Sequence, residues 1–136
     1  MVTDRDLKNN LYWKDKLDAE TYKITREKGT EAPFSGALLD VSDEGIYTCV
    51  CCQQELFIST HKFDAGCGWP SYDAAKTEDA ILYRDDESLG RRRVEILCSK
   101  CDSHLGHIFD DGPTATGKRF CVNSKSLQFK KQSLVD

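Results

Sequence analysis

Two Cys-x-x-Cys motifs constrain this 136-residue chain more than any other feature. The first is Cys49-Val50-Cys51-Cys52 and the second is Cys98-Ser99-Lys100-Cys101, and each follows a stretch that predicts a β-strand. Two such motifs supply four thiolates, and tetrahedral zinc takes four sulfur ligands at about 2.3 Å. We therefore predict one structural zinc ion per chain, which joins distant parts of one domain. The predicted ligands are Cys49, Cys52, Cys98 and Cys101.

Such a site leaves no open position for a substrate, so we expect the metal to have no catalytic role. A thioredoxin-like redox pair is the alternative, but that motif needs a βαβ setting and usually occurs once. Cys51 lies between two predicted ligands, and it either competes for the metal or is a passive small side chain. We favour the passive interpretation. Iron in place of zinc stays open.

The composition excludes several classes of protein. The net charge is −4, whereas general nucleic-acid and membrane-surface binders usually show a basic surplus. The N-terminus carries acidic and amide residues where a signal peptide would be apolar, and no apolar run is long enough to span a bilayer. In a reducing compartment, seven cysteines indicate metal or redox chemistry rather than structural disulfides. We therefore expect a cytoplasmic protein with no nucleic-acid or membrane partner.

The N-terminal part, about residues 3–36, predicts a helical arm. A short helical turn begins after Thr3 or Asp4. A second helix is predicted from Ala19 to about Lys28, with Asp18 as its N-cap and Gly29 as its stop. The side chains expected to face inward are Leu7, Leu11, Trp13, Ala19, Tyr22 and Ile24.

The remainder, about residues 38–130, predicts a β core. Short alternating or apolar runs bounded by turn residues indicate the strands, and residues 85–90 suit a long hairpin loop. The predicted fold class is therefore mainly β, with antiparallel sheets or a barrel-like core behind a short helical arm, in a single domain over residues 1–136. The predicted strands are 45–48, 55–58, 80–84, 92–97, 119–122 and 127–130.

One candidate site surrounds the isolated Cys121. A thiol must lose its proton to act as a nucleophile, and nearby donors or cations favour that loss. If the segment around Cys121 is extended, alternation places Arg119, Cys121 and Asn123 on one face, with a donor on each side of the sulfur. His104 and His107 precede this segment. The alternatives are a buried core cysteine, and histidines that bind a metal or are satisfied in the core.

A second candidate segment contains Cys67 between Gly66 and Gly68. Flanking glycines indicate a mobile, exposed backbone, which suits a cysteine that moves toward a partner sulfur. Trp69 followed by Pro70 presents a fixed aromatic side chain on a loop, as a recognition wall would. The alternative is a tight turn with Trp69 buried in the core.

Several segments in this order resemble the signatures of the B-type methionine sulfoxide reductases. They are KFDAGCGWPS (62–71), HLGHIFDDGP (104–113) and RFCVNS (119–124), with a weaker likeness in the arm at 28–36. The two Cys-x-x-Cys motifs match the zinc site of the family's zinc-containing members. The resemblance covers roughly residues 3–130 and implies an Mss4-like β fold. Small departures are Cys51, Tyr72 and Phe120, and none of them removes a reacting group.

The resemblance implies reduction of methionine-R-sulfoxide in proteins and peptides. Cys121 would attack the sulfoxide sulfur and become a sulfenic acid, which condenses readily with a nearby thiol. Cys67 would be that resolving thiol, giving a Cys67–Cys121 disulfide that thioredoxin reduces. The resemblance is also compatible with a monomer that has thioredoxin and oxidised polypeptides as its partners.

Further roles follow from matched positions in the family. His107 is the first choice of acid at the sulfoxide oxygen, with His104 beside it. Asn123 would donate a hydrogen bond to the substrate or orient a histidine, and Trp69 would pack against the terminal methyl group. The remaining expected contributions are positive charge from Arg119, support of a histidine by Asp111 and substrate contact by Phe120.

Two rival functions stay open at this point. The first is a non-catalytic zinc-bound β scaffold for protein binding, which leaves Cys67, Cys121 and the histidines unexplained as a set. The second is a thiol peroxidase that uses the same two cysteines against hydroperoxides, which leaves Trp69 unexplained.

Overall fold

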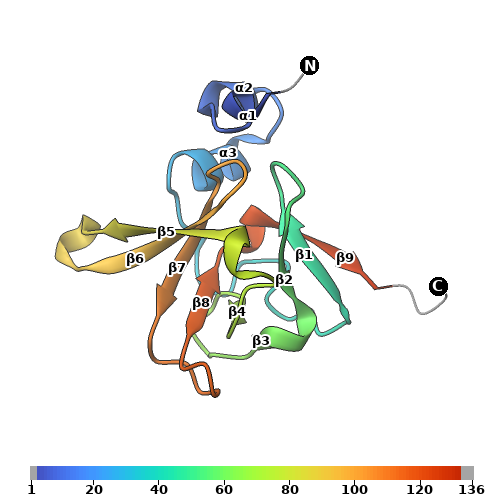
Figure 1. The fold of residues 1–136 in the computed structure, drawn as a ribbon, viewed down its shortest axis with the longest axis vertical. Coiled ribbons are helices and arrows are strands. Elements are labelled where there is room, and N and C mark those ends of the chain that lie inside the picture. Colours follow the sequence, from blue (N-terminus) through green and yellow to red (C-terminus); the bar gives the residue numbers. More distant parts are fainter. Residues whose placement is uncertain (1–2, 133–136) are drawn as a thin grey trace.

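The computed structural model describes residues 3–132. The ends of the single domain predicted over residues 1–136 lie outside these described residues. Two antiparallel sheets form the core (Figure 1): a three-stranded sheet in the order β2-β1-β9 and a six-stranded sheet in the order β3-β4-β8-β7-β6-β5. The prediction of a mainly β, antiparallel fold is confirmed. The strands are β1 (Gly45–Cys49), β2 (Glu55–Ile58), β3 (Lys62–Phe63), β4 (Ser71–Tyr72), β5 (Ile81–Asp86), β6 (Arg93–Cys98), β7 (His104–Phe109), β8 (Arg119–Val122) and β9 (Leu127–Lys131).

Three short helices, α1 (Asp4–Leu7), α2 (Asn10–Lys14) and α3 (Ala19–Arg26), form the N-terminal arm at one end of the molecule (Figure 1). Thr3 caps α1 in a reciprocal capping box, and Asp18 caps α3 as predicted. The helix α3 ends at Arg26 because Lys28, rather than Gly29, takes the left-handed conformation at φ 60°.

The arm is less apolar inside than the sequence suggested. Trp13 and Ile24 are buried as expected, but Leu11 is 71% exposed and Ala19 is also exposed, so these two predictions are wrong. Arg26 is buried instead, and its guanidinium donates to the Cys101 carbonyl at 2.8 Å. The arm is therefore fastened to the second Cys-x-x-Cys turn by a charge-assisted hydrogen bond, in addition to the apolar packing of Trp13 in the core.

An aromatic cluster fills the space between the two sheets. The rings of Phe57 and Tyr72 stack at 4.3 Å between centroids, and Phe120 meets Phe57 edge to face at 5.7 Å. Tyr47 completes the cluster against Tyr72. Fully burying a side chain of this size stabilises a fold by about 1.5–3 kcal/mol, so the cluster is a main source of cohesion between the sheets.

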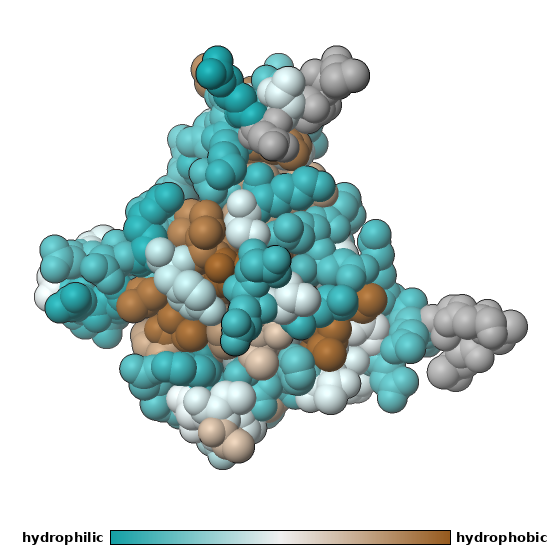
Figure 2. All heavy atoms as spheres, in the orientation of Figure 1, coloured by the Kyte–Doolittle hydropathy of each residue, from teal (hydrophilic) through white to brown (hydrophobic). Residues whose placement is uncertain are grey.

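The outer surface is mainly hydrophilic on the face shown in Figure 2, where only small separated apolar patches interrupt it. None of the helices formed by residues 3–132 has the length and apolar character needed to cross a membrane.

Candidate active site

Cys121 lies in the middle of β8, between two strands that both contribute to the site. Its neighbour across the ladder is His107 on β7 on one side and Ser71 on β4 on the other. The Cys121 Sγ lies 3.7 Å from the Cys67 Sγ, within a cavity of about 250 Å³. Gly106 on β7 has no side chain because the Cys121 carbonyl occupies the space that a Cβ would need. Two cysteines 54 positions apart are thus brought almost into contact.

The expected alternation along β8 holds. Arg119, Cys121 and Asn123 all line this cavity. Phe120 points to the opposite face, where it is only 4% exposed and packs against Phe57. The substrate contact expected of Phe120 is therefore not supported by the structure, because the strand's period of two places that ring in the core.

His104 and His107 share one side of β7 because the strand is irregular. A regular strand places residues three apart on opposite faces. Here Leu97 pairs with His104 while the preceding Ile96 pairs with Gly106, so that Leu105 is an extra residue in β7. This β-bulge reverses the alternation, and the two imidazole centroids lie 5.7 Å apart.

Each histidine is held by a carboxylate from the neighbouring hairpin. The His104 Nδ1 lies 2.6 Å from Glu95, which is fully buried and also pairs with Lys28 of the arm. The His107 Nε2 lies 2.7 Å from Asp86. The support of a histidine that we expected from Asp111 thus falls to Glu95 and Asp86.

Asp111 instead forms a two-point ion pair with Arg119, at 2.8 and 3.1 Å. This pair raises the pKa of Arg119 and lowers that of Asp111. The guanidinium stays on the cavity wall, and its charge acts on both sulfur atoms of the site.

The protonation states follow from burial and from these neighbours. Burial, together with the adjacent Cys67, raises the pKa of Cys121 to about 12, although Arg119 acts in the opposite direction. Burial also opposes ionisation of Cys67, but a hydrogen bond with Ser71 leads the interactions that outweigh it and lower its pKa. At neutral pH the resting Cys121 is therefore a thiol, and Cys67 is the more acidic of the two.

His107 is also affected by its surroundings. Burial is the main cause that lowers its pKa, and the nearby Arg93 adds to this effect, while Asp86 acts against it. The hydrogen bond from His107 holds the pKa of Asp86 well below its usual range. Asp86 is thus an anion that accepts a hydrogen bond from the Nε2–H of His107, which leaves Nδ1 as the ring nitrogen available to a ligand.

The loop that carries Cys67 depends on its glycines. Gly66 and Gly68 have φ values of 70° and 94°, a region that glycine enters without strain. Trp69 is half-buried, and its indole Nε1 donates to the Glu31 carbonyl at 3.0 Å. The indole therefore stands in a fixed orientation beside the two sulfur atoms, rather than inside the core.

Glu31 is another residue of this site, after Glu95 and Asp86, that sequence reasoning did not single out. Its backbone N–H donates to the Asn123 side-chain oxygen, its carbonyl accepts from Trp69, and its carboxylate accepts from the Lys125 N–H, each at 3.0 Å. Asn123 is committed further, because its Nδ2 donates to the Leu105 carbonyl. The amide that we expected to meet a substrate or a histidine instead joins the arm to β7. The likeness within residues 28–36 was the only signal for Glu31.

The four predicted metal ligands come together where β1 and β6 end and their following turns begin. The sulfur atoms of Cys49, Cys52, Cys98 and Cys101 all lie within 4.8 Å of one another. Zinc–sulfur bonds of about 2.3 Å in a tetrahedron place the sulfurs roughly 3.8 Å apart, and the pairs Cys49–Cys101 and Cys52–Cys98 lie at 3.6 and 3.5 Å. These residues can hold a metal ion, and Cys51 is not part of the cluster.

The sequence of this chain is similar to those of known proteins. The family model described as "SelR domain" matches residues 17–131. A "Peptide methionine sulfoxide reductase MsrB" of Herminiimonas arsenicoxydans is 50% identical over 128 residues, which cover 94% of this chain and 93% of the relative. The protein of the same name from Hahella chejuensis is 52% identical over 93% of this chain and 91% of its own.

A solved structure shares the fold at much lower identity. It is described as "Crystal Structure of Mis18 'Yippee-like' Domain", with a TM-score of 0.54 and 14% identity over 66% of this chain and 98% of that one. At this identity the likeness concerns the fold alone.

Proposed function

The chain belongs to the SelR domain family, and on this premise we propose the route by which it reduces methionine-R-sulfoxide in proteins and peptides to methionine. The observation that carries the proposal is the 3.7 Å separation of the Cys67 and Cys121 sulfurs in a cavity that also presents His107 and the Trp69 indole. A sulfoxide needs a nucleophile at sulfur, a proton at oxygen and a wall for its methyl group, and these residues offer all three.

In the first step the Cys121 sulfur attacks the sulfoxide sulfur. The sulfur–oxygen bond of the substrate breaks, and the oxygen remains on Cys121 as a sulfenic acid. The substrate is thereby reduced by two electrons to methionine, and Cys121 is oxidised by two electrons. Because the resting Cys121 is protonated, the thiol brings the proton that this exchange requires, and Arg119 stabilises the thiolate as it forms.

His107 directs that proton to the substrate oxygen. Its Nε2 donates to Asp86, so Nδ1 of the neutral ring is unprotonated. This atom accepts the proton from Cys121 and passes it to the substrate oxygen. His104 does not line the cavity, but it is held by the buried Glu95 beside the His107 ring and limits the positions that this ring can take. Trp69 packs against the methyl group with its flat face, and the Glu31 carbonyl sets the orientation of that indole.

In the second step the Cys67 thiol attacks the sulfenic sulfur. A Cys67–Cys121 disulfide forms and water leaves, so atoms and charge balance. The two sulfurs need to approach by only about 1.7 Å, from 3.7 Å to a bond of about 2.0 Å. A dithiol protein of the thioredoxin class then reduces the disulfide by exchange.

Zinc is the metal that we propose for the four-cysteine cluster. Four thiolates in a closed tetrahedral arrangement are typical of structural zinc sites, and the SelR family has members of this kind. When bound, zinc would supply a cross-link between the turn after β1 and the turn after β6. It takes no part in the redox steps, because the cluster and the Cys121 cavity share no residue.

The test is reduction of one peptide that carries either the R or the S epimer of methionine sulfoxide, driven by dithiothreitol. We expect wild type to consume the R epimer alone and Cys121→Ser to consume neither. A folded, metal-loaded wild type that reduces neither epimer would refute the proposal and favour a binding scaffold. A faster reaction with hydrogen peroxide than with the sulfoxide would favour the peroxidase instead.

A further inference from the structure

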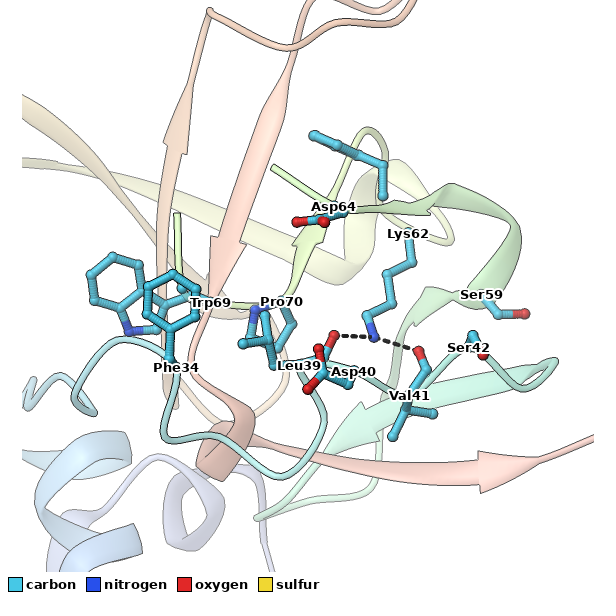
Figure 3. Close-up of a pocket in the computed structure, with 12 residues that line it drawn as sticks. Phe34, Leu39, Asp40, Val41, Ser42, Ser59, Lys62, Asp64, Trp69 and Pro70 are labelled. Carbon is cyan, nitrogen blue, oxygen red and sulfur yellow. Dashed lines mark hydrogen bonds between the residues drawn. The ribbon is translucent and has the colours of Figure 1, made fainter. Parts of the chain in front are cut away.

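A second and larger cavity, of about 470 Å³, lies beside the active-site cavity, and Trp69 is part of the wall of both (Figure 3). It is built from the arm around Phe34, the connection 39–42 that precedes β1, and the start of β3. Nothing in the proposed reaction uses it, since neither cysteine of the redox pair lines it. The two cavities are thus neighbours on the two sides of Trp69.

Phe34 gives the cavity an unusual wall. Its ring is 70% exposed, yet its backbone is held at φ 65°, a conformation that bulky residues rarely adopt. The Phe34 N–H donates to the Gly68 carbonyl at 2.7 Å, and a Cβ on Gly68 would collide with Pro33 and lie tightly against the Phe34 ring. Strain of this kind is retained where the surroundings enforce it, often at ligand sites. The loop of Cys67 thus holds an aromatic face open to solvent.

The cavity has a half-buried ammonium, that of Lys62, and two exposed carboxylates, those of Asp40 and Asp64. Lys62 points across it toward the chain at 39–41, where its ammonium donates to the carbonyls of Leu39 and Val41 (Figure 3). The same ammonium donates to the Leu38 carbonyl. All three of its protons are thereby used within the protein. The carboxylates of Asp40 and Asp64 are exposed and line the cavity. Apolar walls with exposed carboxylates suit a side chain that has an apolar stem and a cationic head.

We propose that this cavity binds a lysine or arginine side chain of the oxidised polypeptide, close in sequence to the methionine sulfoxide. The inference rests on the proposed function. In an extended peptide, side chains two residues apart point the same way at about 6.6 Å, so one fills the active-site cavity while another passes Trp69. The stem packs on Phe34, whose ring face also attracts a cation, and the head meets Asp40 and Asp64. The enzyme therefore favours substrates that have a basic residue near the methionine sulfoxide.

The experiment uses blocked alanine-based heptapeptides with one methionine-R-sulfoxide at the centre. Lysine or glutamate is placed in turn at each of the two positions before and after it. The rates are measured with dithiothreitol, so that no protein reductant takes part. In wild type, at one of these positions, we expect kcat/KM for the lysine peptide to exceed that for the glutamate peptide by about three- to tenfold, as a partly exposed ion pair allows.

The variant Asp40→Asn/Asp64→Asn should lower this ratio to about one. Asparagine keeps the side-chain oxygen that accepts from the Gly66 N–H at 2.9 Å, so the Cys67 loop is retained. The matched control is Asp15→Asn/Glu78→Gln, which changes the net charge equally at exposed sites away from the cavity and should keep the wild-type ratio. Phe34→Gly, which suits the positive φ and removes the ring, should reduce the advantage of lysine over alanine.

A wild-type ratio near one at every position would overturn the proposal, as would a ratio that the double variant retains. A double variant that raises KM for thioredoxin while keeping the peptide ratio would assign the cavity to the reductant, and would overturn it equally. If the function itself is wrong, wild type will reduce no R-sulfoxide, including blocked methionine-R-sulfoxide alone. That failure is distinct from a lost charge preference.

Discussion

The four-cysteine cluster and the Cys67–Cys121 pair both bring cysteine sulfurs together, but the backbones that carry these sulfurs differ. In the cluster the two turns are nearly copies of each other. Gln53 and Asp102 each follow a second cysteine, adopt φ values of 70° and 63°, and donate to the carbonyl of the first cysteine at 2.9 Å. The backbone of both turns is thus fixed by its own hydrogen bonds. Four sulfurs held in this way suit a permanently bound structural metal ion.

The redox pair combines one sulfur on a strand with one on a loop flanked by glycines. Cys121 lies on an inner strand, with ladder partners on both sides, whereas Cys67 lies on a loop whose two glycines supply the positive φ values. Forming and breaking a disulfide requires motion of at least one partner, and glycine makes that motion easy. The number of nearby thiols and the freedom of the backbone therefore separate a structural cysteine from a reacting one.

The largest expected effect is at the cluster. We expect Cys52→Ser to lose the bound metal and the cooperative fold, because structural zinc contributes about 10–16 kcal/mol in small domains at neutral pH, comparable to the whole stability of a domain. Metal content and thermal unfolding would measure this. Cys51→Ser is the matched control and should keep one metal ion with a nearly unchanged melting temperature. A metal lost with Cys51 and kept without Cys52 would reverse the ligand assignment.

Substitution of Cys67 in the redox pair should leave the fold intact but prevent repeated turnover. We expect Cys67→Ser to reduce about one equivalent of R-sulfoxide per chain, because Cys121 still attacks but its sulfenic acid has no resolving thiol. Rapid-quench analysis of methionine formed per enzyme would show this burst, followed by no turnover with thioredoxin. Full turnover in this variant would mean that another thiol resolves the sulfenic acid.

Sequence reasoning went furthest where chemistry is local. The Cys-x-x-Cys spacing identified the cluster, and alternation correctly placed Arg119, Cys121 and Asn123 on one face. It did not predict β7, because glycine and histidine are weak strand formers and the bulge at Leu105 destroys the period of two. Without that strand, the partners of the histidines were assigned to nearby Asp111 rather than to Asp86 and Glu95 of the neighbouring hairpin.

A different limit applies to the arm. The outward position of Leu11 follows from the break between α1 and α2, which resets the helical period that the sequence pattern assumed. The burial of Arg26 depends on a carbonyl 75 positions away, at Cys101. Contacts at such separation leave no periodic trace in a single sequence.

The next effect concerns His107, and it tests whether the site needs more than two thiols. We expect His107→Asn to lower kcat by about 10²–10⁴-fold, as removal of a general acid does. In wild type the proton relay needs the neutral ring, so the rate should fall as pH drops through a His107 pKa that lies below the usual histidine value. Asp86→Asn removes an interaction that raises this pKa, so the fall should move to lower pH. Asp111→Asn, which affects only the Arg119 pair, should leave the profile in place.

The smallest effect compares the two sulfurs directly. The pKa of Cys67 is lowered and that of Cys121 is raised to about 12, so at pH 8 the thiolate population is concentrated on Cys67. Since iodoacetamide reacts with thiolates, we expect Cys67 to be alkylated at least tenfold faster than Cys121, as peptide mass spectrometry of a time course would show. Ser71→Ala removes the hydrogen bond at 3.4 Å that favours the Cys67 anion, and should slow Cys67 while sparing Cys121. Equal rates at the two sulfurs would mean that the resting enzyme activates its nucleophile before substrate arrives, and the thiol form of Cys121 could then no longer be the source of the proton.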